Sequence, residues 1–269
     1  MLPSWLNPVR PVIHAALIDQ HCAEQSWMAR PTTSWTSDQT VPSTDQNTLV
    51  KSLEQLLSAR PTPSKKWLPS PCHVSLILPD SVARYEVLPW TTSLMLADEL
   101  RQFAIERFDM INQPVREGWS VQADWKNNQA NTLAYALPHA LLDALQNVVQ
   151  QHGFILNRVI PLSALAHYGR LGLMRRNELR IMHSGSSTSA LLYLNGKLVS
   201  HLVEIVRGNA SDSTRRLISR LQMSELTTDI KLDKLAMLGV NPINLQEIID
   251  ANAPSHIRLL NPLRWREWQ

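Results

Sequence analysis

The residues of this chain that most suggest chemistry gather in one turn between two apolar segments. This Gly/Ser turn consists of His183, Ser184, Gly185, Ser186, Ser187 and Thr188. Glycine lets the backbone approach an anion closely, and backbone N–H groups and hydroxyls are suitable donors to it. The turn could therefore hold a phosphate. It contains no carboxylate, the group that would hold the Mg²⁺ of a bound nucleotide.

A serine hydrolase is a second chemistry that these residues suggest. Ser184 and Ser186 are close to His183 in the sequence, and His201 follows in the next segment. Many hydrolases present the nucleophilic serine in a G-x-S-x-G turn, and the chain has no such motif. We therefore interpret the Gly/Ser turn as structural.

The histidines and cysteines of the chain give little support for a metal site or a redox site. His139, His152 and His167 lie on or at the ends of predicted apolar helices, where a solvated or capping histidine is commoner than a metal ligand. The two cysteines, Cys22 and Cys72, form neither a C-x-x-C motif nor a Cys/His pattern of zinc-ligand spacing. We expect no metal site and no catalytic residue.

The composition is that of a globular protein with a substantial core. Of 269 residues, 44% are hydrophobic and 18% are charged, with a formal net charge of +3. This length allows one large domain or two modest lobes. The chain has no Lys/Arg cluster that would indicate nucleic-acid binding. No apolar run reaches the roughly 18–20 residues that a membrane span needs, and the N-terminus lacks a signal-peptide apolar region. These features predict a reduced, cytoplasmic protein.

Strand and helix patterns alternate along the chain, which predicts a mixed α/β fold. Apolar runs and alternation predict strands at residues 12–18, 73–78, 83–88, 120–125, 132–137, 155–160 and 234–240, and three strands over 179–208. Helical spacing predicts helices at residues 48–57, 94–108, 138–153, 161–172, 211–221 and 244–251. Residues 31–47 are rich in Thr, Ser, Pro and Asp and are expected to form a loop. Thr92 or Ser93 is the expected cap of the helix at 94–108.

One segment of the chain resembles a known group of proteins in the order of its strands and helix. In residues 73–90 (HVSLILPDSVARYEVLPW), one strand ends in Leu78-Pro79 and the next closes with Leu88-Pro89, before a helix. Pro79-Asp80-Ser81 between the strands suits a turn. This order is similar to the actin-like proteins of type IV pilus and type II secretion systems, namely the PilM family, the cytoplasmic domain of GspL, and MshI.

Two further segments extend the resemblance to most of the chain, from about residue 12 to 240. Residues 135–168 match the strand, long helix, Gly turn, strand and Pro-led helix of these proteins, and residues 179–208 match their triple strand. The resemblance implies an actin-like (ASKHA, or ribonuclease H-like) fold of two lobes. The first lobe would span residues 1–165, with an inserted subdomain at about 90–160, and the second would span 166–269.

The resemblance also implies three nucleotide-binding positions, and the chain departs from the pattern at each. Asp19 matches the first acidic position, but no glycine follows it. His183 stands where the second phosphate loop has its acidic residue. The last motif keeps one glycine, Gly239, instead of two. Acidic groups that orient water and hold Mg²⁺ carry much of phosphoryl transfer, so we expect no ATP hydrolysis and no bound cofactor, with ATP the less favoured alternative.

Two surfaces are candidates for binding partners. Arg215, Arg216 and Arg220 share the polar side of a predicted helix, which is either a solvated face or a basic patch for an acidic partner. The C-terminal stretch is similar to the N-terminal peptide of PilN-type proteins, which docks in a groove of the actin-like partner. Its matching residues are Ile257, Leu259, Leu260, Asn261 and Trp265. The alternative is a terminal strand packed on the second lobe.

The function implied by the resemblance is that of a scaffold at the cytoplasmic side of the inner membrane. It would link the motor ATPase and the polytopic platform protein to bitopic membrane partners of the PilN or GspM kind, without turnover. A homodimer is left open. The alternatives are a nucleotide-binding switch of the same machinery, and an unrelated α/β binding module. The sequence does not decide whether a transmembrane segment follows Gln269 in the native protein.

Overall fold

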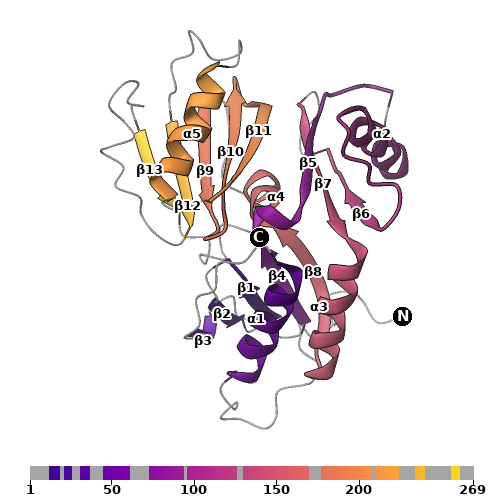
Figure 1. Cartoon of the computed structure of the whole chain (residues 1–269), viewed down its shortest axis with the longest axis vertical. Helices are drawn as coiled ribbons and strands as arrows, with labels where there is room; N and C mark the ends of the chain where they lie inside the picture. The colour runs from indigo at the N-terminus through magenta and orange to yellow at the C-terminus, as the bar shows by residue number, and fades with distance from the viewer. Residues whose placement is uncertain are drawn as a thin grey trace, which may run out of the picture.

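The computed structural model describes residues 12–18, 21–25, 31–36, 45–60, 73–93, 96–125, 130–169, 177–206, 210–223, 234–239 and 256–260. These residues form three β-sheets with helices packed against them (Figure 1). Two of the sheets have five strands each, and the third has three. The mixed α/β character predicted from the sequence is confirmed.

The first lobe is built on a sheet of strand order β3-β2-β1-β4-β8. β1 (Val12–Ala16), β4 (His73–Leu78) and β8 (Ile155–Pro161) run parallel, and β2 (His21–Gln25) and β3 (Pro31–Thr36) continue the sheet antiparallel. The helices α1 (Gln46–Ser58) and α3 (His139–Gln151) lie side by side against it (Figure 1). Their leucines, among them Leu53, Leu56, Leu141 and Leu145, are buried in the core with the strands.

The second lobe is built on a sheet of strand order β11-β10-β9-β12-β13. β9 (Glu178–His183), β10 (Ser187–Leu194) and β11 (Lys197–Ile205) form the predicted antiparallel triple strand. Asn195 and Gly196 turn β10 into β11 with positive φ of 51° and 79°, the backbone that an Asn-Gly hairpin favours. β12 (Lys234–Gly239) and β13 (His256–Leu260) extend the sheet parallel to β9, and α5 (Ala210–Met223) packs on β10 and β11.

The third sheet forms a subdomain inserted into the first lobe, with strand order β5-β7-β6. It contains β5 (Arg84–Leu88), α2 (Ala97–Met110), β6 (Trp119–Gln122) and β7 (Thr132–Pro138), and has its own core around Leu100, Ala104 and Phe108. The insertion therefore runs from Arg84 to Pro138 rather than over residues 90–160. The difference arises because α3 and β8 pack in the first lobe, where β8 pairs with β4.

The helix α4 (Leu162–Tyr168) connects the lobes and lies between them (Figure 1). Residues 162 to 167 are all buried. One hydrophobic cluster continues from the first lobe through α4 to Leu191 and Tyr193 of β10 and Leu198 of β11. The two lobes therefore share part of one hydrophobic core. None of the helices in the described ranges is long and apolar enough to cross a membrane.

Three local expectations differ from the structure. Pro31–Thr36, expected as part of a loop, forms β3, because backbone pairing with β2 stabilises a polar strand at a sheet edge. Neither Thr92 nor Ser93 caps α2; the Glu99 carboxylate accepts from the Leu96 N–H at 3.2 Å instead. The helix expected at 161–172 ends at Tyr168, followed by Gly169 in an extended conformation. The helix expected at 244–251 lies outside the described residues.

The end of α3 depends on a glycine, which gives a testable prediction. Gly153 has φ +76°, and a Cβ there would meet no neighbouring atom, so any cost of a side chain is backbone strain alone. Gly153→Ala should lower the free energy of unfolding by about 1–2 kcal/mol, and Gly153→Asn by less, because asparagine tolerates the left-handed region. Urea denaturation measures both. Gln151→Ala, at an exposed helical position two residues earlier, is the control; an equal effect of Gln151→Ala and Gly153→Ala would contradict the assignment.

Candidate functional site

The carboxyl ends of parallel strands from both lobes meet where the lobes face each other. In the first lobe, Leu78 at the end of β4 pairs with Pro161 at the end of β8. Asp80 and Ser163 each follow two residues later and are thereby brought together. In the second lobe, His183 at the end of β9 is in register with Gly239 at the end of β12. In open α/β sheets, this edge is where ligands commonly bind.

The centre of this region is a buried polar cluster, here called the interlobe site: Asp80, Tyr85, Ser163, Ser189 and His201. The carboxyl group of Asp80 is 1% exposed and makes four contacts. Its Oδ1 accepts from the Tyr85 hydroxyl at 2.5 Å and from the Ser163 N–H at 2.8 Å. Its Oδ2 lies 2.7 Å from Ser163 Oγ and also contacts Ser189 Oγ. One side chain thus joins the first lobe, the inserted subdomain, α4 and the second lobe.

His201 of β11 completes the interlobe site. Its Nε2 lies 3.0 Å from Ser163 Oγ, and its ring contacts that of Tyr85 with a centroid distance of 4.3 Å. Burial lowers the pKa of His201 to about 3, so the imidazole is neutral at neutral pH. Burial raises the pKa of Asp80, partly offset by its hydrogen bonds, and burial together with the adjacent Asp80 raises the pKa of Tyr85 well above its usual value.

The interlobe site does not have the geometry of a serine hydrolase. In a catalytic triad, the histidine lies between the carboxylate and the serine. Here the hydroxyl of Ser163 lies between Asp80 and His201, and Ser163 has no exposed surface. The other serine and histidine candidates are engaged elsewhere: His183 Nδ1 lies 3.0 Å from Thr188 Oγ1, and its Nε2 lies 3.4 Å from Thr214 Oγ1.

The Gly/Ser turn is closed by its own hydrogen bonds. Ser184 N–H donates to the Ser187 carbonyl at 3.0 Å, and Ser186 N–H donates to the Ser184 carbonyl at 2.7 Å. This second bond closes a three-residue turn around Gly185, whose φ of +69° favours glycine. The hydroxyls of Ser184 and Ser187 lie 2.7 Å apart. Two backbone donors and two hydroxyls that could face an anion are therefore used within the turn.

The turn also contacts the first lobe directly. Ser186 Oγ lies 3.0 Å from Ser81 Oγ, which follows Asp80. Ser186 is 6% exposed, and His183 at the start of the turn is also 6% exposed. Burial lowers the pKa of His183 to about 4, so this side chain does not supply a positive charge to an anion at neutral pH. Asp19, the first expected acidic position, lies outside the described residues.

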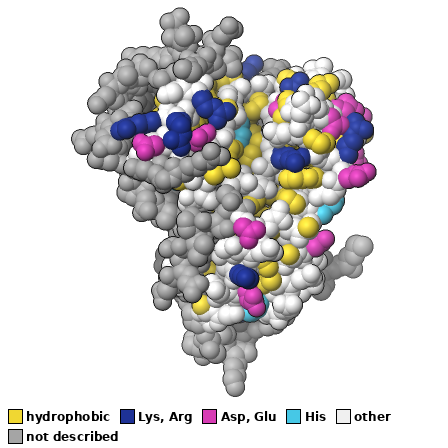
Figure 2. Space-filling view, in the orientation of Figure 1, with side chains coloured by type: hydrophobic (Ala, Val, Ile, Leu, Met, Phe, Trp, Pro, Cys, Tyr) yellow, Lys and Arg dark blue, Asp and Glu magenta, His cyan; other side chains and the backbone are white. Residues whose placement is uncertain are grey.

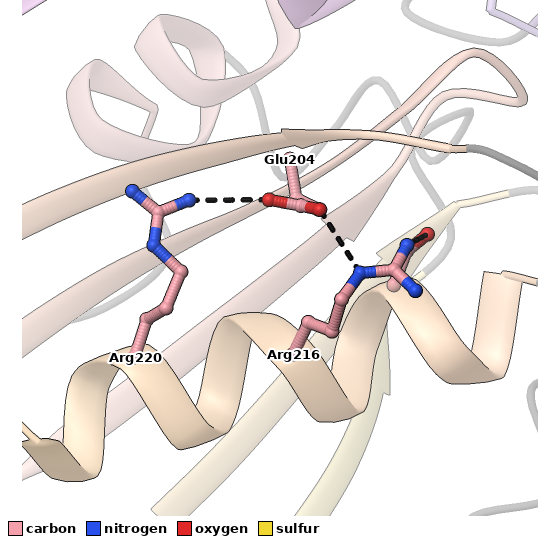
Figure 3. A network of polar contacts seen from close by, with 4 residues as sticks. Glu204, Arg216 and Arg220 are labelled. Carbon is pink, nitrogen blue, oxygen red and sulfur yellow. Dashed lines mark hydrogen bonds and ion pairs between the residues drawn. The ribbon is translucent and has the colours of Figure 1, made fainter.

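The three arginines expected to form a basic patch on α5 are largely paired. Arg216 and Arg220 both contact Glu204 of β11, at 3.0 and 3.1 Å (Figure 3). Arg215 lies 3.9 Å from Asp212. Figure 2 shows Lys or Arg side chains next to Asp or Glu side chains in the region of α5. Arg216 and Arg220 therefore tie α5 to β11, whereas Arg215 pairs within the helix, and the local excess of positive charge is small. Partly exposed pairs of this kind contribute about 0.2–1 kcal/mol each.

The expected partner-binding stretch at the C-terminus begins inside the second lobe. Ile257, Leu259 and Leu260 belong to β13, which is parallel to β12. This arrangement agrees with the alternative of a terminal strand packed on the second lobe. Asn261 and Trp265 lie outside the described residues.

No protein-family model and no curated protein matches the sequence. The structure is similar to a Bacteroides thetaiotaomicron protein of unknown function with an actin-like ATPase fold, at 10% identity and a TM-score of 0.59, covering 99% of this chain and 98% of the other. This chain has an actin-like fold. The fold expected from the sequence is confirmed.

Two further solved structures share the actin-like fold of this chain. One is the cytoplasmic domain of EpsL, an inner-membrane component of the Vibrio cholerae type II secretion system, with 12% identity and a TM-score of 0.54; the match covers 93% of this chain and 89% of that one. The other is the PilM–PilN type IV pilus biogenesis complex, with 10% identity and a TM-score of 0.56; the match covers 96% and 89%.

The local sequence pattern around Asp80 indicates a turn and does not by itself identify the interlobe site. A usable signal was present, because Asp80 comes directly after a buried apolar strand, at the end where α/β sheets place their sites. The partners Ser163 and Ser189 lie 83 and 109 residues further along the chain, so their convergence follows from the topology and not from any local pattern. Within the described residues, no group of histidine, cysteine, aspartate and glutamate side chains could hold a metal ion.

The buried contacts of Asp80 predict a large effect of its removal. Asp80→Ala leaves the Tyr85 hydroxyl and the Ser163 N–H without their acceptor in a dry environment, and each such donor costs about 1–3 kcal/mol. We expect a loss of about 3 kcal/mol or more in the free energy of unfolding, measured by urea denaturation. Asp143→Ala, at an exposed position on α3, should change it by less than about 0.5 kcal/mol. Similar stabilities of the two variants would contradict the buried role of Asp80.

Proposed function

We propose that this chain is a non-hydrolysing scaffold of an inner-membrane assembly platform, of the type IV pilus or type II secretion kind. The proposal is supported by the fold that it shares over most of its length with the EpsL cytoplasmic domain and with PilM in its complex with PilN. In this role the chain lies on the cytoplasmic side of the membrane. It connects the motor ATPase and the platform protein to a bitopic partner of the PilN or GspM kind.

The observation that carries the absence of turnover is the saturation of the Asp80 carboxyl group. Each of its two oxygens contacts two protein groups: Oδ1 contacts Tyr85 and the Ser163 N–H, and Oδ2 contacts the hydroxyls of Ser163 and Ser189. Neither oxygen is open to a Mg²⁺ ion or to an attacking water, the two tasks that a carboxylate performs in phosphoryl transfer. A nucleotide between the lobes would have to break these contacts and the bond between Ser81 and Ser186.

A nucleotide-binding switch of the same machinery is the second candidate. The Gly/Ser turn still lies beside Gly239 at the edge where the lobes meet, which is the place where an actin-like protein would hold phosphate. Binding of a nucleotide there would break the contacts of the interlobe site. The two candidates therefore predict opposite responses to ATP.

The ATP experiment has two readouts. With Mg²⁺-ATP, the purified chain should release no phosphate above the level of a His183→Ala variant, and its melting temperature should stay unchanged. A ligand present at 100 times its Kd would add about 2.7 kcal/mol to stability, which a thermal shift detects easily. Turnover that His183→Ala abolishes would refute the scaffold without hydrolysis, and a thermal shift without turnover would favour the switch.

The partner role of the C-terminal stretch needs a variant that keeps the sheet intact. Removal of residues 261–269 leaves β13 in place and deletes Asn261 and Trp265. Pull-down of a tagged PilN- or GspM-like protein from the same organism should succeed with the full chain and fail with the truncated one, while the melting temperature stays the same. Arg215→Glu is the control that tests the other candidate partner surface, the arginine-bearing face of α5. Equal capture by the truncated and full chains would remove this stretch from the proposed interface.

A further inference from the structure

Three oxygen atoms at the centre of the interlobe site lie within hydrogen-bond distance of one another. Asp80 Oδ2 is 2.7 Å from Ser163 Oγ and also contacts Ser189 Oγ, and the two serine oxygens are 2.9 Å apart. The three atoms form a triangle, and each of its three edges needs one hydrogen. The two serine hydroxyls supply only two.

The remaining donors around the triangle are committed elsewhere. The Tyr85 hydroxyl and the Ser163 N–H use their hydrogens on Asp80 Oδ1. The neutral His201 ring has a single N–H; placed on Nε2, it serves the 3.0 Å contact with Ser163 Oγ and no edge of the triangle. If Asp80 is ionised, one edge therefore brings two oxygen atoms together with no hydrogen between them.

We propose that Asp80 carries a proton in the folded protein at neutral pH, and that this proton closes a cyclic hydrogen-bond lock between the two lobes. In this arrangement, Asp80 donates to Ser163, Ser163 donates to Ser189, and Ser189 donates back to the Asp80 carboxyl group. Every edge then has one hydrogen. The lock joins the turn after β4, the start of α4 and β10, and its existence does not depend on the proposed scaffold role.

The surroundings of Asp80 favour the neutral acid. The titratable groups that face it are Tyr85 from β5 and His201 from β11, both uncharged at neutral pH, while α4 and β10 contribute serines. The described residues that contact the carboxyl group include no cation. Burial without a counter-charge disfavours the ionised form, in agreement with the raised pKa of Asp80.

Because of the lock, the stability of the folded protein should decrease as the pH rises. A carboxyl group whose pKa is raised by folding contributes stability that is full below its ordinary pKa and is lost as the pH rises through the folded value. Deprotonation above neutral pH should therefore weaken the contact between the lobes. Asp80→Asn retains the shape of the acid and supplies amide hydrogens to Ser163 and Ser189, so it should hold the lock at every pH.

Infrared spectroscopy in D₂O tests the proton directly. The wild type and the control variant Asp143→Asn should both show the C=O stretching band of a protonated carboxylic acid at pH 7, and Asp80→Asn should lack it. The melting temperature of the wild type should fall relative to that of Asp80→Asn as the pH rises from the ordinary pKa of the group, 3.8, through its raised folded value.

Two outcomes would overturn the proposal. One is the absence of the acid band from the wild type at pH 7. The other is a wild-type melting temperature that rises relative to that of Asp80→Asn over the same pH range. If Asp80→Asn does not fold, the wild-type band alone decides: it should be present at pH 7 and disappear only as the pH is raised.

Discussion

The arrangement of the two lobes depends on how one buried carboxyl group is satisfied. A polar group that is buried without partners is strongly destabilising, so Asp80 can remain at the centre of the molecule only because four contacts converge on it. These contacts come from the inserted subdomain, the connecting helix α4 and the second lobe. Separation of the lobes would leave several buried donors and acceptors unpaired at once. The same group that positions the lobes therefore also opposes their opening.

This constraint is consistent with the scaffold role that we propose for this chain. The parallel strands of the actin-like fold bring their carboxyl ends to the region between the lobes, where an enzyme would place phosphate-binding loops. In this chain, the hydrogen bonds at that edge are made between protein groups, both around Asp80 and within the Gly/Ser turn. A protein closed in this way offers fixed outer surfaces, which is what a stable assembly of several partners requires.

The sequence predicts the local elements well and the contacts between them poorly. The amphipathic pattern and the flanking Pro138 and Gly153 define α3, and the Asn195-Gly196 pair defines the β10–β11 hairpin, because these signals act within a few residues. β3 has no such signal, since its partner strand determines its conformation. The interlobe site was missed for the same reason: Asp80 is satisfied by groups that only the folded topology brings near. The arginines of α5 were visible in the sequence, but their pairing with Glu204 was not.

Hydrogen exchange of the Ser163 amide tests the central claim most directly, because this N–H donates to Asp80 within the interlobe site. If the lobes are locked together, the amide should exchange only when the whole protein unfolds. Mg²⁺-ATP should leave the exchange rate of this amide unchanged. Rapid exchange in the free protein, or a rate that changes when Mg²⁺-ATP is added, would contradict a closed and nucleotide-independent contact between the lobes.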